Sequence, residues 1–461
     1  MTFNHLIPSP KMLSKILYRS LALSSLVVAL SSLVVAISGC NNTYVLTSPA
    51  DTAKVLKAGT DPSKSAAQQD AIQPVLTDDS VATPKGLNQV VTANNQFAIA
   101  LYQQLNAQAD QNNKNLFFSP YSLSSAMAML YNAAQGETKQ QIEQVFYYPK
   151  VTTLNANSAA LYQQFNKPNP DYQFVSANDI WIAQGLKPSK SYLDTLAHYY
   201  GSQVTNLDFK NSPEAARLKI NATIADYTQQ MIPALMSPSS ISANTATVLT
   251  NAVYFKGDWQ TPFNPSEKKL FSLFDGNTVT IDMMHNKADF AYTEDEHAQI
   301  IKLPYKGEAL SMMVILPKAK DQAAMQSLSE SLSTNQIEQW NKSLVKREVI
   351  VDLPKFKLQQ SYEMTPLLSK MGMPIAFSSQ ADFSLFSDQI AIKVDAMVHQ
   401  AVIEVDETGT KAAAATGVII VPMSLGYSTN RIEFTADHPF IFVIKDNATG
   451  TILFLGQVNK P

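Results

Sequence analysis

The stretch Glu407-Thr-Gly-Thr-Lys-Ala-Ala-Ala-Ala-Thr416 decides how this sequence is interpreted. It consists mostly of small residues and contains no bulky apolar side chain. It runs on through Val418-Ile-Ile-Val421, whose β-branched side chains favour a strand, and then into Pro422-Met423-Ser424. A segment with these two halves can be an exposed loop in one state and a buried strand in another.

As a strand, this segment would have one face that can be buried. Side chains alternate between the two faces of a strand, and one face carries no charge: Thr410, Ala412, Ala414, Thr416, Val418 and Ile420. Lys411 falls on the opposite face with Ala413 and Ala415, so its charge can remain in water. Gly409 precedes this run, and we expect its backbone freedom to let the chain turn into a sheet.

Helices are predicted in the region that precedes most of the strands. Apolar residues recur at helical spacing over Val91–Ala109. Ser119-Pro120 predicts the start of a second helix over Tyr121–Ala134, because serine caps a helix and proline fits its first turn. Gly136 is expected to end that helix.

Strand-forming runs are more numerous and lie mainly in the second half of the chain. Because strands and helices mix without a βαβ rhythm, the sequence predicts an α+β protein with large, mainly antiparallel sheets. The segment 407–433 has no obvious partner, and such a long segment inside a compact domain is usually functional or disordered. The predicted strands are 174–175, 179–182, 247–255, 310–316, 348–353, 390–394, 402–405, 441–444 and 452–455.

The N-terminus differs from the rest of the chain. Basic residues precede the apolar run Leu21–Ile37. Ser38-Gly39-Cys40 follows the run, and Cys40 is the only cysteine of the chain. This pattern is typical of a secretory signal, and its end resembles a bacterial lipobox, in which the cysteine is lipidated. The alternative is an uncleaved anchor helix with an incidental cysteine. We therefore expect a signal peptide over 1–39, a lipidated Cys40 with a flexible tether to about 90, and a folded domain over 91–461 without a disulfide.

Several blocks of sequence, in order along the chain, resemble the serpin family of serine protease inhibitors. The resemblance covers roughly 91–461 and implies three β-sheets, about eight or nine helices and an exposed reactive-centre loop. One block alone would be weak support for the resemblance. Seven blocks in the same order are strong support. The blocks are Asn115–Ser122, Gly136–Thr138, Leu249–Trp259, Leu353–Phe356, Met371–Met373, Ala381–Phe383 and Phe434–Phe440.

The resemblance also implies a mechanism and its residues. A protease would cut the loop, remain attached as an acyl-enzyme and be carried along as the loop inserts into the central sheet. The family's spacing places the reactive bond between Met423 and Ser424, with Leu425 and Tyr427 left open as other positions. The Pro-Met-Ser triplet, as in antitrypsin-type serpins, suits elastase- or chymotrypsin-like proteases. The hinge would comprise Glu407, Gly409, Thr410, Ala412, Ala413, Ala414, Ala415 and Thr416.

A second implied site is a polar latch beneath the central sheet, the shutter, formed by Ser119, Ser122, Asn251 and His399. Lys411 departs from the family, which usually has an acid at this position. Because Lys411 falls on the exposed face of the inserted strand, we expect insertion to tolerate it.

Other functions find little support in the sequence. A net charge of −3 does not suggest nucleic-acid binding, and no Gly-x-Ser-x-Gly elbow suggests a hydrolase. No metal or cofactor is expected, since His285 and His297 have no standard metal-site spacing. We expect a monomeric inhibitor, not an enzyme, held in the bacterial envelope by its lipid and forming a covalent complex with a serine protease. The alternative is a non-inhibitory serpin with a binding or structural role.

Overall fold

A computed structural model gives the structure of the protein and describes residues 77–108, 114–202, 204–387, 391–410 and 432–461. All of these residues belong to one unit, Asp70–Pro461. Several predicted features lie outside the described residues: the signal segment expected over 1–39, Cys40, Ala412, Ala413, Ala414, Ala415, Thr416, Met423 and Ser424. Within the described part of the chain, no helix is long and apolar enough to span a bilayer.

Nine α-helices occur among the described residues, together with one short 3-10 helix, η1 (Ile375–Phe377). They are α2 (Pro84–Gln108), α3 (Pro120–Tyr131), α4 (Gly136–Phe146), α5 (Val151–Asn166), α6 (Lys190–Tyr200), α7 (Pro213–Tyr227), α8 (Gln322–Ser331), α9 (Thr334–Ser343) and α10 (Met364–Met371).

The first two predicted helices are present, with corrections at their ends. α2 begins at Pro84 rather than at residue 91, and Thr77 is already buried, with its hydroxyl donating to Ala159 O at 3.2 Å. Residues 77–90, which were expected to belong to the tether, are therefore part of the folded unit. Ser119 caps α3 as predicted, but Gly136 does not end that helix. Gly136 instead begins α4, with a φ of +51° that favours glycine.

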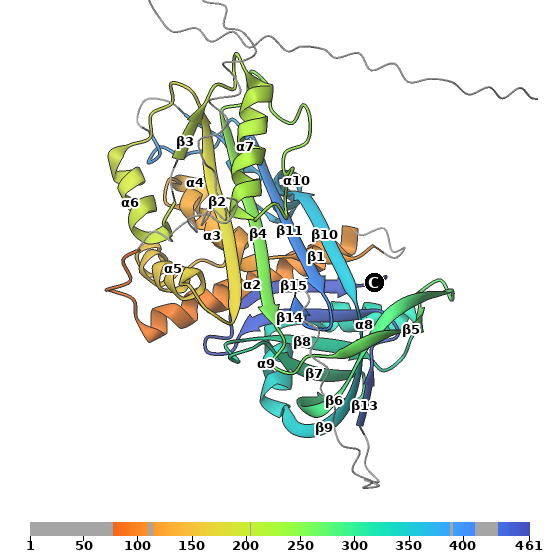
Figure 1. The fold of residues 1–461 in the computed structure, drawn as a ribbon. Helices are drawn as coiled ribbons and strands as arrows, with labels where there is room; N and C mark the ends of the chain where they lie inside the picture. Colours follow the sequence, from red (N-terminus) through yellow and green to blue (C-terminus); the bar gives the residue numbers. More distant parts are fainter. Residues whose placement is uncertain (1–76, 109–113, 203, 388–390, 411–431) are drawn as a thin grey trace, which may run out of the picture. The chain divides into compact units, whose positions relative to one another are not determined.

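The central sheet has six strands in the order β10-β11-β12-β4-β2-β3. β4 and β11 are parallel neighbours, and β2 pairs with β4 in the antiparallel sense. Figure 1 shows β2, β4, β11 and β10 running side by side through the centre of the unit. The strands are β10 (Phe356–Glu363), β11 (Ala396–Val405), β12 (Gly409–Thr410), β4 (Thr247–Asp258), β2 (Tyr172–Ala183) and β3 (Val204–Leu207).

The remaining nine strands form a second path, β1-β15-β14-β8-β7-β6-β9-β13, with β5 paired to β6. Four residues of β6, Ala291–Glu294, pair with β7 and so join these strands into one sheet. The described residues therefore form two hydrogen-bonded sheets rather than the three expected, and the α+β class is confirmed. The strands are β1 (Leu116–Phe118), β5 (Asn264–Ser272), β6 (Thr278–Glu294), β7 (Ala298–Pro304), β8 (Leu310–Pro317), β9 (Val345–Pro354), β13 (Ile432–Thr435), β14 (Phe440–Asp446) and β15 (Ile452–Val458).

The strand predicted at 390–394 is absent, since residues 391–395 have no regular structure. Ile392 and Val394 are buried, which accounts for their apolar character without a strand. Their neighbour Asp395 instead accepts hydrogen bonds from the backbone N–H groups of Ala246 and Thr247 at the start of β4. The side chain thus holds irregular backbone in place beside the central sheet.

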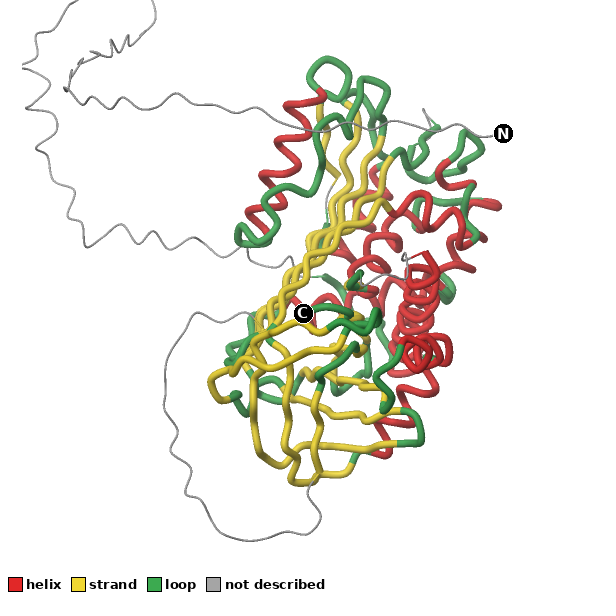
Figure 2. The backbone as a smooth tube through the Cα atoms, turned by 90° about the vertical axis from the view of Figure 1, so that its right-hand side faces the viewer, coloured by secondary structure: helices red, strands yellow, loops and turns green. Residues whose placement is uncertain are grey.

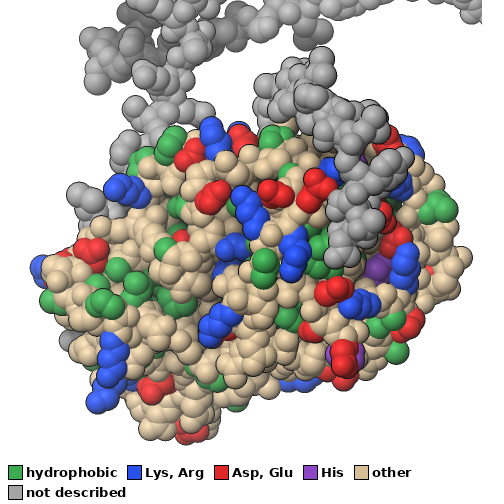
Figure 3. All heavy atoms as spheres, turned by 90° about the horizontal axis from the view of Figure 1, so that it is seen from below, with side chains coloured by type: hydrophobic (Ala, Val, Ile, Leu, Met, Phe, Trp, Pro, Cys, Tyr) green, Lys and Arg blue, Asp and Glu red, His purple; other side chains and the backbone are tan. Residues whose placement is uncertain are grey.

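The two faces of the central sheet are covered differently. The main core, which includes Leu123 of α3, packs against Leu249 and Val253 of β4 on one face. A separate, smaller cluster on the other face joins α7 to the sheet. Figure 2 shows α7 alone on its side of the strands, with the bulk of the helices on the other. On the face seen in Figure 3, basic and acidic side chains of the described residues are interspersed.

Candidate functional site

The first residues of the predicted loop already occupy the central sheet. Thr410 of β12 pairs with Val405 of β11 on one side and with Gly257 of β4 on the other, and both pairings are antiparallel. Further along, β11 and β4 pair directly, from Ala396 opposite Val248 to Val402 opposite Tyr254. β12 therefore adds two residues to the central sheet, next to the ends of β4 and β11.

Both ends of the segment 407–433, for which the sequence suggested no partner, are thus paired in the structure. Gly409–Thr410 forms β12, and Ile432–Thr435 forms β13, which runs parallel to β9. Neither run is long or apolar enough to be recognised as a strand from its sequence alone. Residues 411–431 lie outside the described residues.

Gly409 is required for a different reason from the one expected. A β-carbon at Gly409 would overlap the carbonyl oxygen of Gly257 and lie 2.5 Å from Asp258 Cα. The structure does not give Gly409 a left-handed φ. In this state, close approach to β4 requires the glycine, rather than backbone freedom.

Thr410 is fully buried, and its hydroxyl lies 2.8 Å from Tyr305 Oη. The Tyr305 ring stacks on Trp259, with ring centroids 4.6 Å apart. Burial raises the pKa of Tyr305 well above its ordinary value, so the phenol stays protonated and can donate or accept this bond. The first inserted side chain is therefore held by a specific polar contact.

The turn before β12 is anchored at Glu407. Its carboxylate lies 2.9 Å from Lys355 Nζ and accepts a hydrogen bond from Ser266 N at 3.3 Å. Partial burial acts to raise the pKa of Glu407, but hydrogen bonds from its own N–H, Lys355 and Ser266 lower it overall. The backbone of Glu407 and Thr408 also accepts bonds from Phe263 N and Trp259 N, both at 2.8 Å. The backbone at the start of the predicted hinge is thus held by these hydrogen bonds and the ion pair.

The four predicted shutter residues lie together, and all are fully buried. The His399 imidazole accepts a hydrogen bond from Ser119 N at Nε2, at 3.1 Å. Because a backbone N–H can only donate, Nε2 is unprotonated and Nδ1 carries the proton. Nδ1 therefore donates to Asn251 Oδ1. The Asn251 amide in turn donates to Ser122 Oγ at 2.5 Å.

Burial lowers the pKa of His399 to about 3. The imidazole is therefore neutral near pH 7, as its contact with Ser119 N requires. The ring of Tyr362 on β10 lies nearly parallel to it, with centroids 6.4 Å apart. Together these contacts give His399 one tautomer and one orientation.

Two members of this network were missed from the sequence, Ser176 and Asn178 of β2. Asn178 Oδ1 accepts a hydrogen bond from Asn251, and Ser176 Oγ lies 2.7 Å from Ser122 Oγ. The alternation of β2 places Ser176 and Asn178 on one face, but only the sheet register brings them to Asn251. The completed network, which we call the shutter network, ties β2, β4 and β11 to α3.

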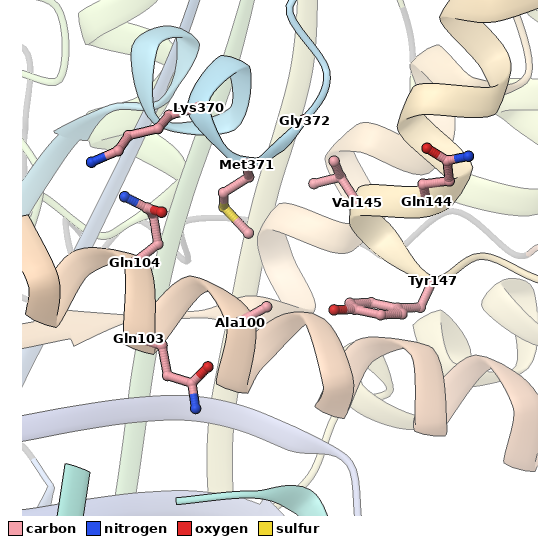
Figure 4. A pocket seen from close by; sticks show the side chains of 9 residues that line it. All are labelled: Ala100, Gln103, Gln104, Gln144, Val145, Tyr147, Lys370, Met371 and Gly372. Carbon is pink, nitrogen blue, oxygen red and sulfur yellow. The ribbon is translucent and has the colours of Figure 1, made fainter. Parts of the chain in front are cut away.

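A pocket of about 430 Å³ opens between α2, α4 and α10 (Figure 4) and shares no lining residue with the shutter network. Figure 4 shows Met371 pointing into it from α10. It is lined by Ala100, Gln103, Gln104, Gln144, Val145, Tyr147, Lys370, Met371 and Gly372, a set without a carboxylate, histidine or thiol for catalysis. Among the described residues, no three His, Cys, Asp or Glu side chains gather as a metal site would need.

Comparison with known proteins agrees with this architecture. The family model described as Serpin (serine protease inhibitor) matches residues 92–461. An uncharacterized serpin-like protein of Methanosarcina acetivorans is 38% identical over 376 residues, which cover 81% of this chain and 88% of that protein. Human leukocyte elastase inhibitor is 35% identical over 386 residues, covering 81% of this chain and all of the inhibitor (100%).

Solved structures give the same result. Uncleaved ovalbumin superposes with a TM-score of 0.73 at 26% identity, covering 81% of this chain and 100% of ovalbumin. Human thyroxine-binding globulin in complex with its hormone has a TM-score of 0.74 at 27% identity, covering 82% of this chain and 99% of the globulin. The family model matches residues 92–461, and the match to the 38% identical relative covers 88% of that protein. This chain therefore belongs to the serpin family.

Proposed function

We propose that this protein is an inhibitory serpin that traps serine endopeptidases by inserting its cleaved loop between β4 and β11. The position of β12 carries this proposal. Gly409 and Thr410 are paired with β4, and Thr410 also with β11, antiparallel to both. A strand continuing from Thr410 in the same direction would enter the space that opens when β4 and β11 separate.

Insertion would lower the free energy. The direct pairs between β4 and β11 would be lost, but each inserted residue would bond to both strands. A net hydrogen bond contributes about 1 kcal/mol. With about ten residues inserted, the gain is on the order of 10 kcal/mol, and the uncut state is then kinetically trapped.

The reactive bond is proposed to be Met423-Ser424, with elastase- or chymotrypsin-like proteases as targets. A long, unbranched apolar side chain suits the specificity pocket of those proteases better than the pocket of a trypsin-like protease, which takes Arg or Lys. The relatives named leukocyte elastase inhibitor support this choice. Cys40 is proposed to be lipidated and to tether the inhibitor to the bacterial envelope.

The test uses the soluble domain from residue 70 onward, incubated with pancreatic elastase and run on a denaturing gel. The proposal predicts a covalent complex that survives SDS and a matching loss of elastase activity. Ala414→Arg, on the buried face, should convert the inhibitor into a substrate. Ala413→Arg, on the opposite face, is the matched control and should still trap. Cleavage of the wild type with full elastase activity would contradict the proposal.

A second candidate is a non-inhibitory serpin that binds a ligand. The similarity to thyroxine-binding globulin in complex with its hormone favours it. The same gel distinguishes the two, because a binding serpin would be cut without forming a complex. The shutter network does not discriminate between them, since a stable sheet also needs its buried polar groups hydrogen-bonded.

A further inference from the structure

Asp179 is a buried acid that the proposed mechanism does not use. It lies in β2 and is only 6% exposed, and its Oδ2 atom has no hydrogen-bond partner. No ion pair to it occurs among the described residues. Its neighbour Asn178 faces the shutter network, so alternation turns Asp179 to the other face of the sheet, the one covered by α7. A buried carboxyl without a partner is costly.

The face that buries Asp179 is held by the small hydrophobic cluster beneath α7. On the helix side the cluster includes Ile220 and Ile224, and on the sheet side Trp181 of β2, Val248 of β4 and Val402 of β11. It therefore bridges the strands that must part when a new strand enters. Separation of β4 from β11 would disturb the cluster directly.

The chain leaving α7 is also under strain. Gln229 and Gln230 have φ values of +51° and +63°, a left-handed conformation that is unfavourable for residues other than glycine. Their N–H groups donate to Asp226 O and Ala225 O, at 3.3 and 2.7 Å, so this strain lies in the turn that ends α7. The unfavourable term that depends on docking is therefore the buried acid beneath the helix.

No cation offsets Asp179 from the elements packed on it. From α7, Tyr227 faces it; burial raises the pKa of Tyr227, and the charge of Asp179 raises it further. Thr250 of β4 lies opposite, does not titrate, and accepts a hydrogen bond from Trp181 Nε1 at 2.8 Å. Arg217 of α7 is held by Glu214 and by Met236 O. Burial alone raises the pKa of Asp179 to about 7.

We propose that Asp179 is a proton-controlled switch that sets how firmly α7 docks on the central sheet. When the carboxyl is neutral, α7 stays docked. When the carboxyl is ionised, the buried charge favours a state in which α7 leaves the sheet and water reaches β2. The effect of ionisation on docking does not depend on the proposed function. Its consequence, easier opening of the sheet for the loop, rests on the proposed function.

The direction with pH follows from proton linkage. The carboxyl has a pKa of about 7 when α7 is docked and would return toward its ordinary 3.8 once hydrated. Undocking therefore releases a proton at pH values between these two. The undocking equilibrium constant should rise with pH across this range and level off above pH 7, with a gain of about tenfold between pH 6 and pH 8.

The test is hydrogen–deuterium exchange at the amides of α7 in the wild type and in Asp179→Asn, at pH 6, 7 and 8. Taking the ratio of the two proteins at each pH cancels the intrinsic pH dependence of exchange. The ratio of wild type to variant should rise about tenfold from pH 6 to pH 8. Asp226→Asn, on the exposed side of α7, is the matched control and should behave as the wild type.

A ratio that stays constant from pH 6 to pH 8 would overturn the proposal, and so would an equal change in both variants. If Asp179→Asn does not fold, the wild type alone gives the answer. Exchange at α7 relative to α6 should then rise with pH, and an unchanged ratio would overturn the proposal. No protease is involved, so this outcome is independent of the elastase experiment. If trapping of elastase failed, the proposed effect of Asp179 on docking of α7 would be unaffected.

Discussion

His399 on β11 and Asn251 on β4 lie directly opposite each other and are joined by a buried hydrogen bond from Nδ1 to Oδ1. This bond adds a side-chain link to the backbone pairing between the two strands that the proposed insertion must separate. It continues to Ser119 and Ser122 at the start of α3. The pairing of β4 with β11 and the position of α3 are thus coupled through one buried hydrogen-bond network.

Asn251→Ala should weaken the closed sheet. It removes the acceptor for His399 Nδ1 and the donor to Ser122 Oγ, leaving buried polar groups without partners. The expected loss is about 2–4 kcal/mol in the free energy of unfolding, since each orphaned group costs about 1–3 kcal/mol. Urea denaturation measures it. Asn244→Ala, in the exposed turn before β4, is the control and should change little.

The neutral state of His399 predicts a stability component that depends on pH. The pKa falls from 6.5 to about 3 on folding, so the unfolded chain takes up the proton more readily. This component is fully present above pH 6.5 and is lost as pH falls toward 3, by about 1.4 kcal/mol per pH unit.

The measurement is the unfolding free energy of the wild type minus that of His399→Gln, at pH 7 and at pH 5. The difference should shrink by about 2 kcal/mol at pH 5. Subtraction is needed because Asp179 acts in the opposite direction over an overlapping range: its raised pKa lowers stability as pH rises from 3.8 to about 7. A difference that is the same at both pH values would contradict the neutral assignment.

Thr410 and Tyr305 should be energetically coupled. Tyr305→Phe leaves the Thr410 hydroxyl buried without a partner, and Thr410→Val does the same to the phenol. Each single change should cost about 1–3 kcal/mol, and the double variant should cost less than the sum. A double-mutant cycle measured by urea denaturation gives the coupling. If the costs of the two single changes add exactly in the double variant, the Thr410–Tyr305 contact does not stabilise the hinge.

Gly409→Ala should expel the hinge from the sheet, because the added β-carbon overlaps Gly257 O. Insertion would then start from an unpaired loop and should be slower. The expected result is a larger number of inhibitor molecules consumed for each elastase molecule trapped. Thr408→Ala, one residue earlier, is the control. Equal trapping by Gly409→Ala and the wild type would show that β12 pairing is not needed.

The sequence predicted the shutter residues because they fall within blocks shared with a known family, not because their contacts could be deduced. Ser176 and Asn178 could not be assigned, since their role depends on the register of β2 against β4. The partner of Glu407, Lys355, lies 52 residues away, and nothing local links the two. Ser119 was predictable as a helix cap because that signal lies within a few residues.

The errors have similar causes. Gly136 was taken as the end of a helix because glycine commonly stands there, but a tight connection put its positive φ at the start of α4. The apolar run at 390–394 was taken as a strand, although Ile392 and Val394 are buried in irregular backbone. A short connection between two helices decided the first case, and tertiary packing, which the local sequence does not encode, decided the second.

The central claim is that the loop enters the sheet between β4 and β11 once it is cut. The most direct measurement is the thermal midpoint of the domain before and after cleavage of the loop by a metalloprotease, which forms no acyl-enzyme and therefore cannot be trapped. A gain on the order of 10 kcal/mol should raise the midpoint by about 10 °C or more. A midpoint that is unchanged or lower after complete cleavage would show that the loop does not insert, and would contradict the account.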